Sequence, residues 1–280
     1  MKTLPKKLST LLLGASLLLG GNAIAQETDN SLQAVKDRGE LRVAVFSDKP
    51  PFGYVDRAGK SQGYDIELAK ELGKALFGSE DKVTYVLTEA QNRINVLDAN
   101  KVDITLANFT VTPARSEQVD FAEPYMKVAI GLVSPNGAPI NDIAELNGKT
   151  IIVNKGTTAE TYFAKNHPEV NLQKYDHNSE AFAALQDGRA VGLAHDNALL
   201  YAWAKNNPNF TVSLQKIGPD DVIAPAVKKG NTELLNWVNA QILELQTQEF
   251  FHKAYDNAVK PFYGDNIDPD NIVIDASNRK

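Results

Sequence analysis

The amino-acid sequence predicts an α/β protein with two lobes, each built on a mainly parallel sheet that helices flank. Short apolar strands alternate with helices of about ten residues, which is typical of β-α-β units that cover a sheet on both faces. This alternation runs through the first part of the chain and starts again near residue 149. A third block of strand and long helix follows, so we expect the chain to cross between the lobes twice.

The first unit supplies most of one lobe. Its predicted elements are, in order, a helix over 29–38, a strand over 41–46, a Pro/Gly loop over 48–54, a hairpin turn over 56–59, a helix between residues 65 and 78, a strand over 83–87, a helix around 94–97 and a strand over 102–106. Asp65 is expected to cap its helix, because a carboxylate accepts hydrogen bonds from free N–H groups at an N-terminus. Gly78 ends that helix, since glycine readily adopts the left-handed conformation.

The second unit and the third block complete the pattern. Strands are predicted over 149–153, 172–175 and 190–194, and helices over 158–165, 179–187 and 197–205. The third block is a strand over 222–227, a turn over 228–231 and an amphipathic helix over 233–246. With the crossings near residues 132–133 and 218–221, lobe 1 comprises residues 26–132 and 222–280, and lobe 2 comprises residues 133–221.

The first 25 residues have the three parts of a cleavable signal peptide. A basic start is followed by an apolar run over 8–19, and Ala23-Ile24-Ala25 fits the small-x-small pattern before a cleavage site. The run is shorter than a bilayer span and is interrupted by glycine. Removing residues 1–25, which hold three lysines and no acid, takes the formal charge from −6 to −9. The sequence therefore predicts an exported, acidic protein of the periplasm.

Composition excludes several classes of function. The chain has no cysteine, which rules out a disulfide scaffold, a cysteine nucleophile and a lipid-anchoring thiol. With 29 Lys and Arg against 35 Asp and Glu, nucleic acid is not expected as the partner. The four histidines lack metal-ligand spacing, and no phosphate-binding or dinucleotide-binding motif is present, so neither a metal nor a cofactor is expected.

Polar loops follow several predicted strands, at the sheet edge where ligands bind in α/β proteins. One of them places Asn108, Thr110 and Thr112 beside Arg115. A guanidinium holds both oxygens of a carboxylate, so this loop indicates a carboxylate site. The alternative is that Arg115 opens a solvated helix together with Glu117.

The second lobe offers further polar groups. A glycine-containing turn leads to a helix N-terminus at Thr158, where free N–H groups favour an anion. Asp196 ends a strand of small residues and is interpreted either as the partner of a ligand ammonium or as the cap of the helix that follows. His195 is expected to pair with Asp196 or to lie at the surface. In the Pro-rich loop of lobe 1, Phe52 and Tyr54 form either an aromatic wall for a ligand or part of the core.

Several stretches resemble the polar-amino-acid family (family 3) of periplasmic solute-binding proteins of ABC importers. They are Lys49-Pro-Pro-Phe-Gly-Tyr54, Gly63-Tyr-Asp-Ile-Glu67, Asn108-Phe-Thr-Val-Thr-Pro-Ala-Arg115, Val119-Asp-Phe-Ala-Glu-Pro-Tyr125, Lys155-Gly-Thr-Thr158 and Ala224-Pro-Ala-Val-Lys-Lys-Gly230. The resemblance covers the mature chain and implies the type II periplasmic-binding-protein fold, with a hinge between the lobes. Within the family, the stretches 46–54, 89–93, 107–110 and 195–197 look most like a cysteine-binding branch.

The resemblance also implies roles for individual residues. Arg115 would hold the ligand α-carboxylate with the amides around Thr158. Thr110, the Asn108 region and Asp196 would take the α-ammonium, and Phe52 would line the cleft. Arg93 matches an arginine that contacts acidic side chains in aspartate and glutamate binders, although it could instead pair with Glu89 one helical turn earlier.

We therefore expect a monomeric transport protein that binds a free amino acid and delivers it to the permease and ATPase subunits of an ABC importer. Cysteine is favoured over aspartate or glutamate, because Asp48 in the first cleft loop would repel a second carboxylate. Two other classes stay open. One is a periplasmic dehydratase of cyclohexadienyl substrates, for which Glu160 is the candidate acid, and the other is an additional role as a surface adhesin or antigen.

Overall fold

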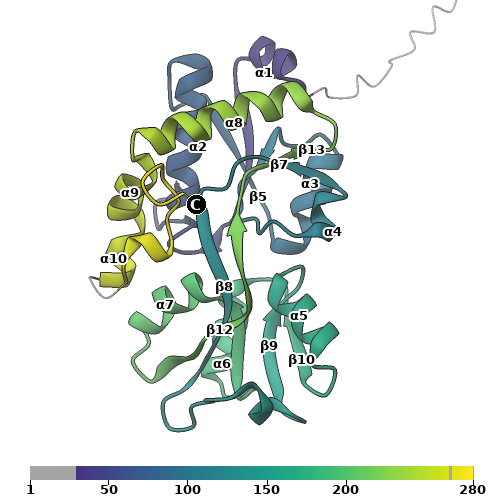
Figure 1. Ribbon diagram of the computed structural model, residues 1–280, viewed down its shortest axis with the longest axis vertical. Helices are drawn as coiled ribbons and strands as arrows, with labels where there is room; N and C mark the ends of the chain where they lie inside the picture. The colour runs from purple at the N-terminus through teal and green to yellow at the C-terminus, as the bar shows by residue number, and fades with distance from the viewer. Residues whose placement is uncertain (1–29, 265–266, 280) are drawn as a thin grey trace, which may run out of the picture.

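The computed structural model describes residues 30–264 and 267–279. The predicted signal peptide lies outside these residues. The described chain forms two lobes, one in the upper and one in the lower half of Figure 1, and each lobe holds a sheet with helices packed against it. The predicted fold class is confirmed.

The sheet of lobe 1 has the strand order β5-β1-β6-β13-β7. Its strands are β1 (Leu41–Val45), β5 (Val83–Leu87), β6 (Ile104–Thr105), β7 (Val119–Phe121) and β13 (Ala226–Lys228). β1 pairs in parallel with both β5 and β6, whereas β13, which arrives late in the sequence, is antiparallel to β6 and β7. The strand predicted over 222–227 is interrupted at Pro225, which has no N–H group to donate to a neighbouring strand.

A small antiparallel sheet lies beside this one. It comprises β2 (Asp48–Lys49), β3 (Gly53–Val55) and β4 (Ser61–Gln62), and its turn between β3 and β4 contains the predicted turn over 56–59. The β2 strand matters most for the site, because it lies at the border with lobe 2.

Helices of lobe 1 enclose its sheet. They are α1 (Leu32–Arg38), α2 (Tyr64–Phe77), the short helix η1 (Ala90–Asn92), α3 (Arg93–Asp98), α4 (Pro113–Ser116), α8 (Thr232–Thr247), α9 (Phe250–Ala254), the π-helix η3 (Tyr255–Val259), α10 (Lys260–Tyr263) and the short helix η5 (Pro269–Asn271). Gly78 ends α2 in the left-handed conformation as predicted. The predicted cap is wrong, because Gly63 occupies the cap position and the Asp65 side chain is fully buried inside the lobe.

The sheet of lobe 2 has the order β10-β9-β11-β8-β12. Its strands are β8 (Met126–Pro135), β9 (Thr150–Asn154), β10 (Asn171–Tyr175), β11 (Gly192–Asp196) and β12 (Phe210–Ile223), and its helices are η2 (Ile143–Leu146), α5 (Thr158–Asn166), α6 (Asn178–Gln186) and α7 (Asn197–Lys205). β11 begins and ends two residues later than predicted. Asp196 is therefore its last residue and directly precedes α7.

Two long antiparallel strands join the lobes. β8 and β12 run side by side from one half of the molecule to the other, and they pair from Phe210 opposite Pro135 to Ile223 opposite Met126. The register shifts at several points between Val212 and Asp220, where the ladder is interrupted. The predicted lobe boundaries fall within these two strands and stay a prediction.

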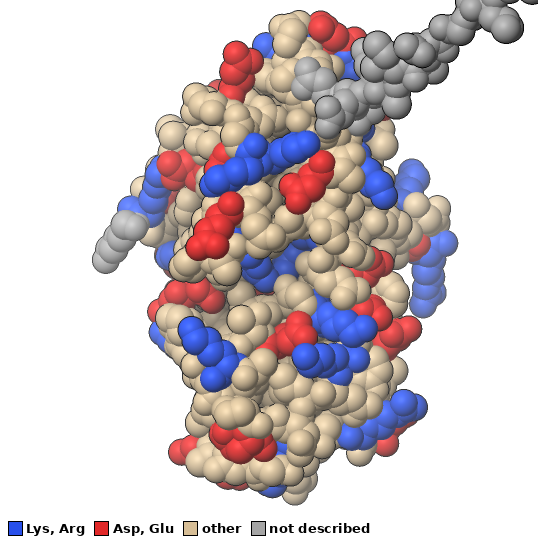
Figure 2. Space-filling view, turned by 90° about the vertical axis from the view of Figure 1, so that its right-hand side faces the viewer, with Lys and Arg blue, Asp and Glu red and all other residues tan. Residues whose placement is uncertain are grey.

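The distribution of charge and the length of the helices bear on function. Basic and acidic side chains are interspersed over the face shown in Figure 2, unlike the single-sign surface that is typical of nucleic-acid binding. None of the helices in the described ranges is long and apolar enough to cross a membrane.

Candidate functional site

A small cavity of about 10 Å³ lies where the two lobes meet. This volume holds about one water molecule. Its walls come from the ends of β1 and β2, from η1 and α3, from the loop after β6, from the start of α5 and from the end of β11. The lining residues are Phe46, Lys49, Ala90, Arg93, Thr110, Thr157, Thr158, His195 and Asp196. The structure thus brings together four of the predicted site residues, namely Arg93, Thr110, Thr158 and Asp196.

Lys49 and Asp196 form an ion pair across the cavity. The Lys49 Nζ atom lies 2.6 Å from a carboxylate oxygen of Asp196, and the two side chains are 1% and 7% exposed. Burial alone would raise the pKa of Asp196, but Lys49, His195 and Arg93 outweigh it and hold this pKa at about 2. Asp196 is therefore an anion, and its side chain makes no capping bond to α7.

Lys49 is the residue of the cavity that sequence reasoning missed. Lysine is rarely buried, so a lysine in a Pro-rich loop is normally expected to be solvated. Its position directly before Pro50-Pro51, in a stretch that carries the family resemblance, is the signal that could have identified it.

The Arg93 guanidinium is held by backbone carbonyl groups. It donates to the oxygens of Ala90 at 2.9 Å, Ala107 at 3.2 Å, Asn108 at 3.1 Å and Gly156 at 3.0 Å. It also lies 4.4 Å from the centre of the Phe109 ring. The expected alternative pairing with Glu89 is not what the structure shows, since Glu89 accepts from Asn92 instead.

Arg115 also points from lobe 1 toward lobe 2. Its guanidinium donates to the Thr110 oxygen at 2.7 Å and to the same Gly156 oxygen that Arg93 uses, at 2.8 Å. Burial lowers the pKa of Arg115 to about 10, so the group is charged at neutral pH. The alternative that Arg115 opens a solvated helix does not hold for its side chain, although α4 does begin at Pro113.

The loop that carries Asn108 is supported by Asp65. One Asp65 oxygen accepts from the Asn108 N–H at 2.7 Å, and the other accepts from the Tyr125 hydroxyl at 2.6 Å. Burial raises the pKa of Asp65 to about 6. The Asn108 side chain itself is fully buried and donates to the sulfur of Met126 rather than facing the cavity. Its backbone carbonyl, by contrast, helps to hold Arg93.

The lobe 2 wall is built on the start of α5. Thr157 caps this helix by accepting from the Glu160 N–H, and Thr158 is its first residue. The Glu160 carboxylate accepts from the Gly156 N–H at 2.7 Å and pairs with Lys174 at 2.9 Å. Both of its oxygens are therefore engaged in holding the turn before the helix.

His195 lines the cavity as a neutral ring. Its Nδ1 atom accepts from the Asp196 N–H at 2.7 Å, which leaves the ring proton on Nε2. Burial, assisted by the nearby Lys49 cation, lowers the pKa of His195 to about 3. His195 therefore pairs with Asp196 as expected, but through the backbone N–H group of Asp196.

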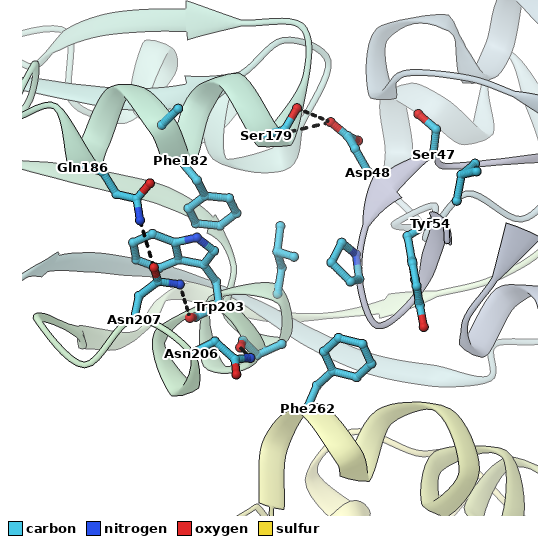
Figure 3. A pocket seen from close by; sticks show the side chains of 15 residues that line it. Ser47, Asp48, Tyr54, Ser179, Phe182, Gln186, Trp203, Asn206, Asn207 and Phe262 are labelled. Carbon is cyan, nitrogen blue, oxygen red and sulfur yellow. Dashed lines mark hydrogen bonds between the residues drawn. The ribbon is translucent and has the colours of Figure 1, made fainter. Parts of the chain in front are cut away.

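Phe52 and Tyr54 do not line this cavity. Phe52 belongs to the lobe 1 core, with its ring 6.0 Å from the Lys49 Nζ atom. Tyr54 faces a larger pocket of about 470 Å³ at the outer seam between the lobes, where its ring and that of Phe262 pack in a T-shaped arrangement (Figure 3). Asp48 also lines the larger pocket and not the cavity, and its carboxylate is bound to Asn178 and Ser179.

A two-lobed fold with a buried, charged cavity between the lobes is typical of solute-binding proteins. The family model of bacterial extracellular solute-binding proteins, family 3, matches residues 41–260, and the chain belongs to this family. Among the residues that the structure describes, no group of three or more acidic or histidine side chains could hold a metal ion.

Solved structures and a curated relative agree with this assignment. A solute receptor for L-cysteine of Neisseria gonorrhoeae is 55% identical, with a TM-score of 0.86 over 88% of this chain and 100% of that one. A cysteine-binding protein from Campylobacter jejuni is 52% identical, with a TM-score of 0.86 over 87% of this chain and 98% of that one. An ABC transporter glutamine-binding protein of Bacillus subtilis is 28% identical over 242 residues, which is 86% of this chain and 88% of the relative.

Proposed function

We propose that this solute-binding protein takes up L-cysteine between its lobes and delivers it to the permease and ATPase subunits of an ABC importer. It acts as a monomer in the periplasm, after removal of residues 1–25. The likeness to two cysteine receptors at 55% and 52% identity supports the ligand, and the family supports the transport role.

The observation that carries the choice of ligand is the engagement of Arg93. A binder of aspartate or glutamate needs a cation that is available to the second carboxylate. The Arg93 guanidinium instead donates to four backbone carbonyl oxygens, and the Lys49 ammonium is paired with Asp196. An uncharged side chain such as that of cysteine suits a site whose Arg93 and Lys49 cations are already partnered.

The main-chain groups of the ligand are assigned as follows. Arg115 donates to only two carbonyls, so N–H groups of its guanidinium remain for an anion. We therefore assign the α-carboxylate to Arg115 and to the N–H groups at the start of α5, where a helix N-terminus also favours an anion. The Asp196 oxygen that does not pair with Lys49 receives the α-ammonium together with Thr110. A zwitterion that bridges the lobes in this way satisfies charges on both, and this couples binding to closure.

An enzymatic role is not proposed. A dehydratase needs a positioned acid. The carboxylate of the candidate Glu160 instead accepts from the Gly156 N–H and pairs with Lys174. Incubation with prephenate is therefore expected to give no phenylpyruvate, and its formation would establish the enzyme instead.

Calorimetric titration tests the choice of ligand. The protein is unfolded and refolded to remove bound amino acids, and then titrated with L-cysteine, L-aspartate and L-glutamate at one pH under reducing conditions. L-Serine and L-alanine serve as matched probes of the thiol. Cysteine is expected to bind tightest, and tighter binding of aspartate or glutamate would overturn the assignment.

A further inference from the structure

Both side chains of the two-residue strand β2 reach across to lobe 2. Lys49 pairs with Asp196 inside the cavity, while Asp48 points the other way, toward the N-terminus of α6 (Figure 3). One Asp48 oxygen accepts from the Asn178 side-chain amide at 3.0 Å. The other accepts from the Ser179 N–H at 3.2 Å and from its hydroxyl at 3.4 Å.

The α6 helix has no cap of its own. The residue before it is His177, whose side chain makes no capping bond. By contrast, α5 is capped by Thr157, the residue that directly precedes it. The first N–H groups of a helix lack partners within the helix, and a carboxylate placed there also interacts favourably with the helix dipole. In this structure the other lobe provides that carboxylate.

We propose that Asp48 is an affinity-determining residue that caps α6 across the lobe boundary and retains the ligand without contacting it. The inference rests on the proposed two-lobe binding function. Asp48 and α6 belong to different lobes, so the cap forms as the lobes come together. Interactions made only in the closed form shift the equilibrium toward that form, and so strengthen binding of any ligand that requires it.

The geometry separates this role from ligand contact. Asp48 borders the larger seam pocket and is not among the residues that line the small cavity, where its neighbour Lys49 lies. Consecutive side chains of a strand point to opposite faces, which places the ion pair on one side of β2 and the cap on the other.

Asp48→Ala tests the proposal, with L-cysteine as the probe. If the calorimetric titrations show that another amino acid binds more tightly than L-cysteine, that amino acid is used as the probe instead. The test of Asp48 therefore does not depend on the choice of ligand. Loss of a helix cap corresponds to roughly 2- to 30-fold weaker binding. The change is expected mainly in a faster dissociation rate, with the melting temperature of the ligand-free protein unaltered. Asp81→Ala, which removes an exposed acid from the same lobe, is the control for charge.

Two further variants distinguish the cap from a general structural effect. Asp48→Asn keeps an acceptor but loses the charge, so its dissociation rate is expected to lie between those of the wild type and Asp48→Ala. His177→Ser gives α6 a cap from its own lobe without adding a charge beside Asp48, so Asp48→Ala is expected to cost less affinity in that background. An unchanged affinity for Asp48→Ala, or an equal loss in both backgrounds, would overturn the proposal.

Discussion

Gly156 of lobe 2 lies against the backbone of Gln91 in lobe 1. A Cβ atom at position 156 would stand 2.5 Å from the Gln91 Cα atom and 2.6 Å from its nitrogen. The Gly156 carbonyl meanwhile accepts from both Arg93 and Arg115. The turn before α5 is therefore packed closely against the backbone of lobe 1, next to residues that line the cavity.

Gly156→Ala is expected to prevent full closure and to weaken ligand binding by at least tenfold, because backbone atoms cannot move aside as a flexible side chain can. The measurement is calorimetric titration with L-cysteine. Gly188→Ala is the matched control, since Gly188 has a similar φ of +72° but open space around its Cα atom. Equal affinities for the two variants would show that the contact does not limit closure.

Arg115→Ala is expected to abolish detectable binding while the fold stays intact. Removing one partner of a buried, charged hydrogen bond costs roughly 2–5 kcal/mol, which corresponds to a factor of about 30 or more in affinity. Arg115→Lys keeps the charge but not the planar fork, and should recover only part of the loss. Arg189→Ala, on an exposed ion pair with Asp187, serves as the control. Near-normal affinity of Arg115→Ala would remove this residue from the site.

Ligand binding is expected to make the molecule more compact. Small-angle scattering should show a smaller radius of gyration at saturating L-cysteine, because the ligand holds the lobes together. The melting temperature should also rise, by an amount that corresponds to about 2.7 kcal/mol at a ligand concentration of 100 times Kd. A ligand that raises the melting temperature without compaction would argue against closure as the binding mechanism.

The lowered pKa of His195 is expected to make the stability of the fold depend on pH. Its pKa in the folded protein is lowered to about 3 from 6.5, so the unfolded chain takes up the proton first on acidification. The stability that the neutral ring contributes is complete above about pH 6.5 and is lost as the pH falls toward 3. The loss is at most about 1.4 kcal/mol per pH unit.

His195→Gln removes this titration. Between pH 6.5 and 4, the free energy of unfolding of the variant should fall less steeply than that of the wild type. Urea unfolding at several pH values measures both slopes, and His167→Gln provides a control at a histidine outside the cavity. Parallel slopes for His195→Gln and the wild type would contradict the buried, neutral state of the ring.

The sequence by itself determined the alternation of strands and helices, the two α/β units and the polar loops at Arg115, Thr158 and Asp196. These features are local. Apolar periodicity, glycine stops and the residues at strand ends act over a few positions, so they can be interpreted without knowing what packs against them.

Tertiary structure alone decided which of these groups meet. The sequence predicts a helix cap at Asp65, which instead supports the Asn108 loop. It predicts an acidic partner for Arg93, which instead binds backbone carbonyls. It predicts no role for Lys49, which pairs with Asp196, 147 residues away. The physical reason is that a buried charge is stable only with partners, and here those partners come from distant segments or from the other lobe. No local pattern records such a pairing, because it exists only once the lobes are folded and in contact.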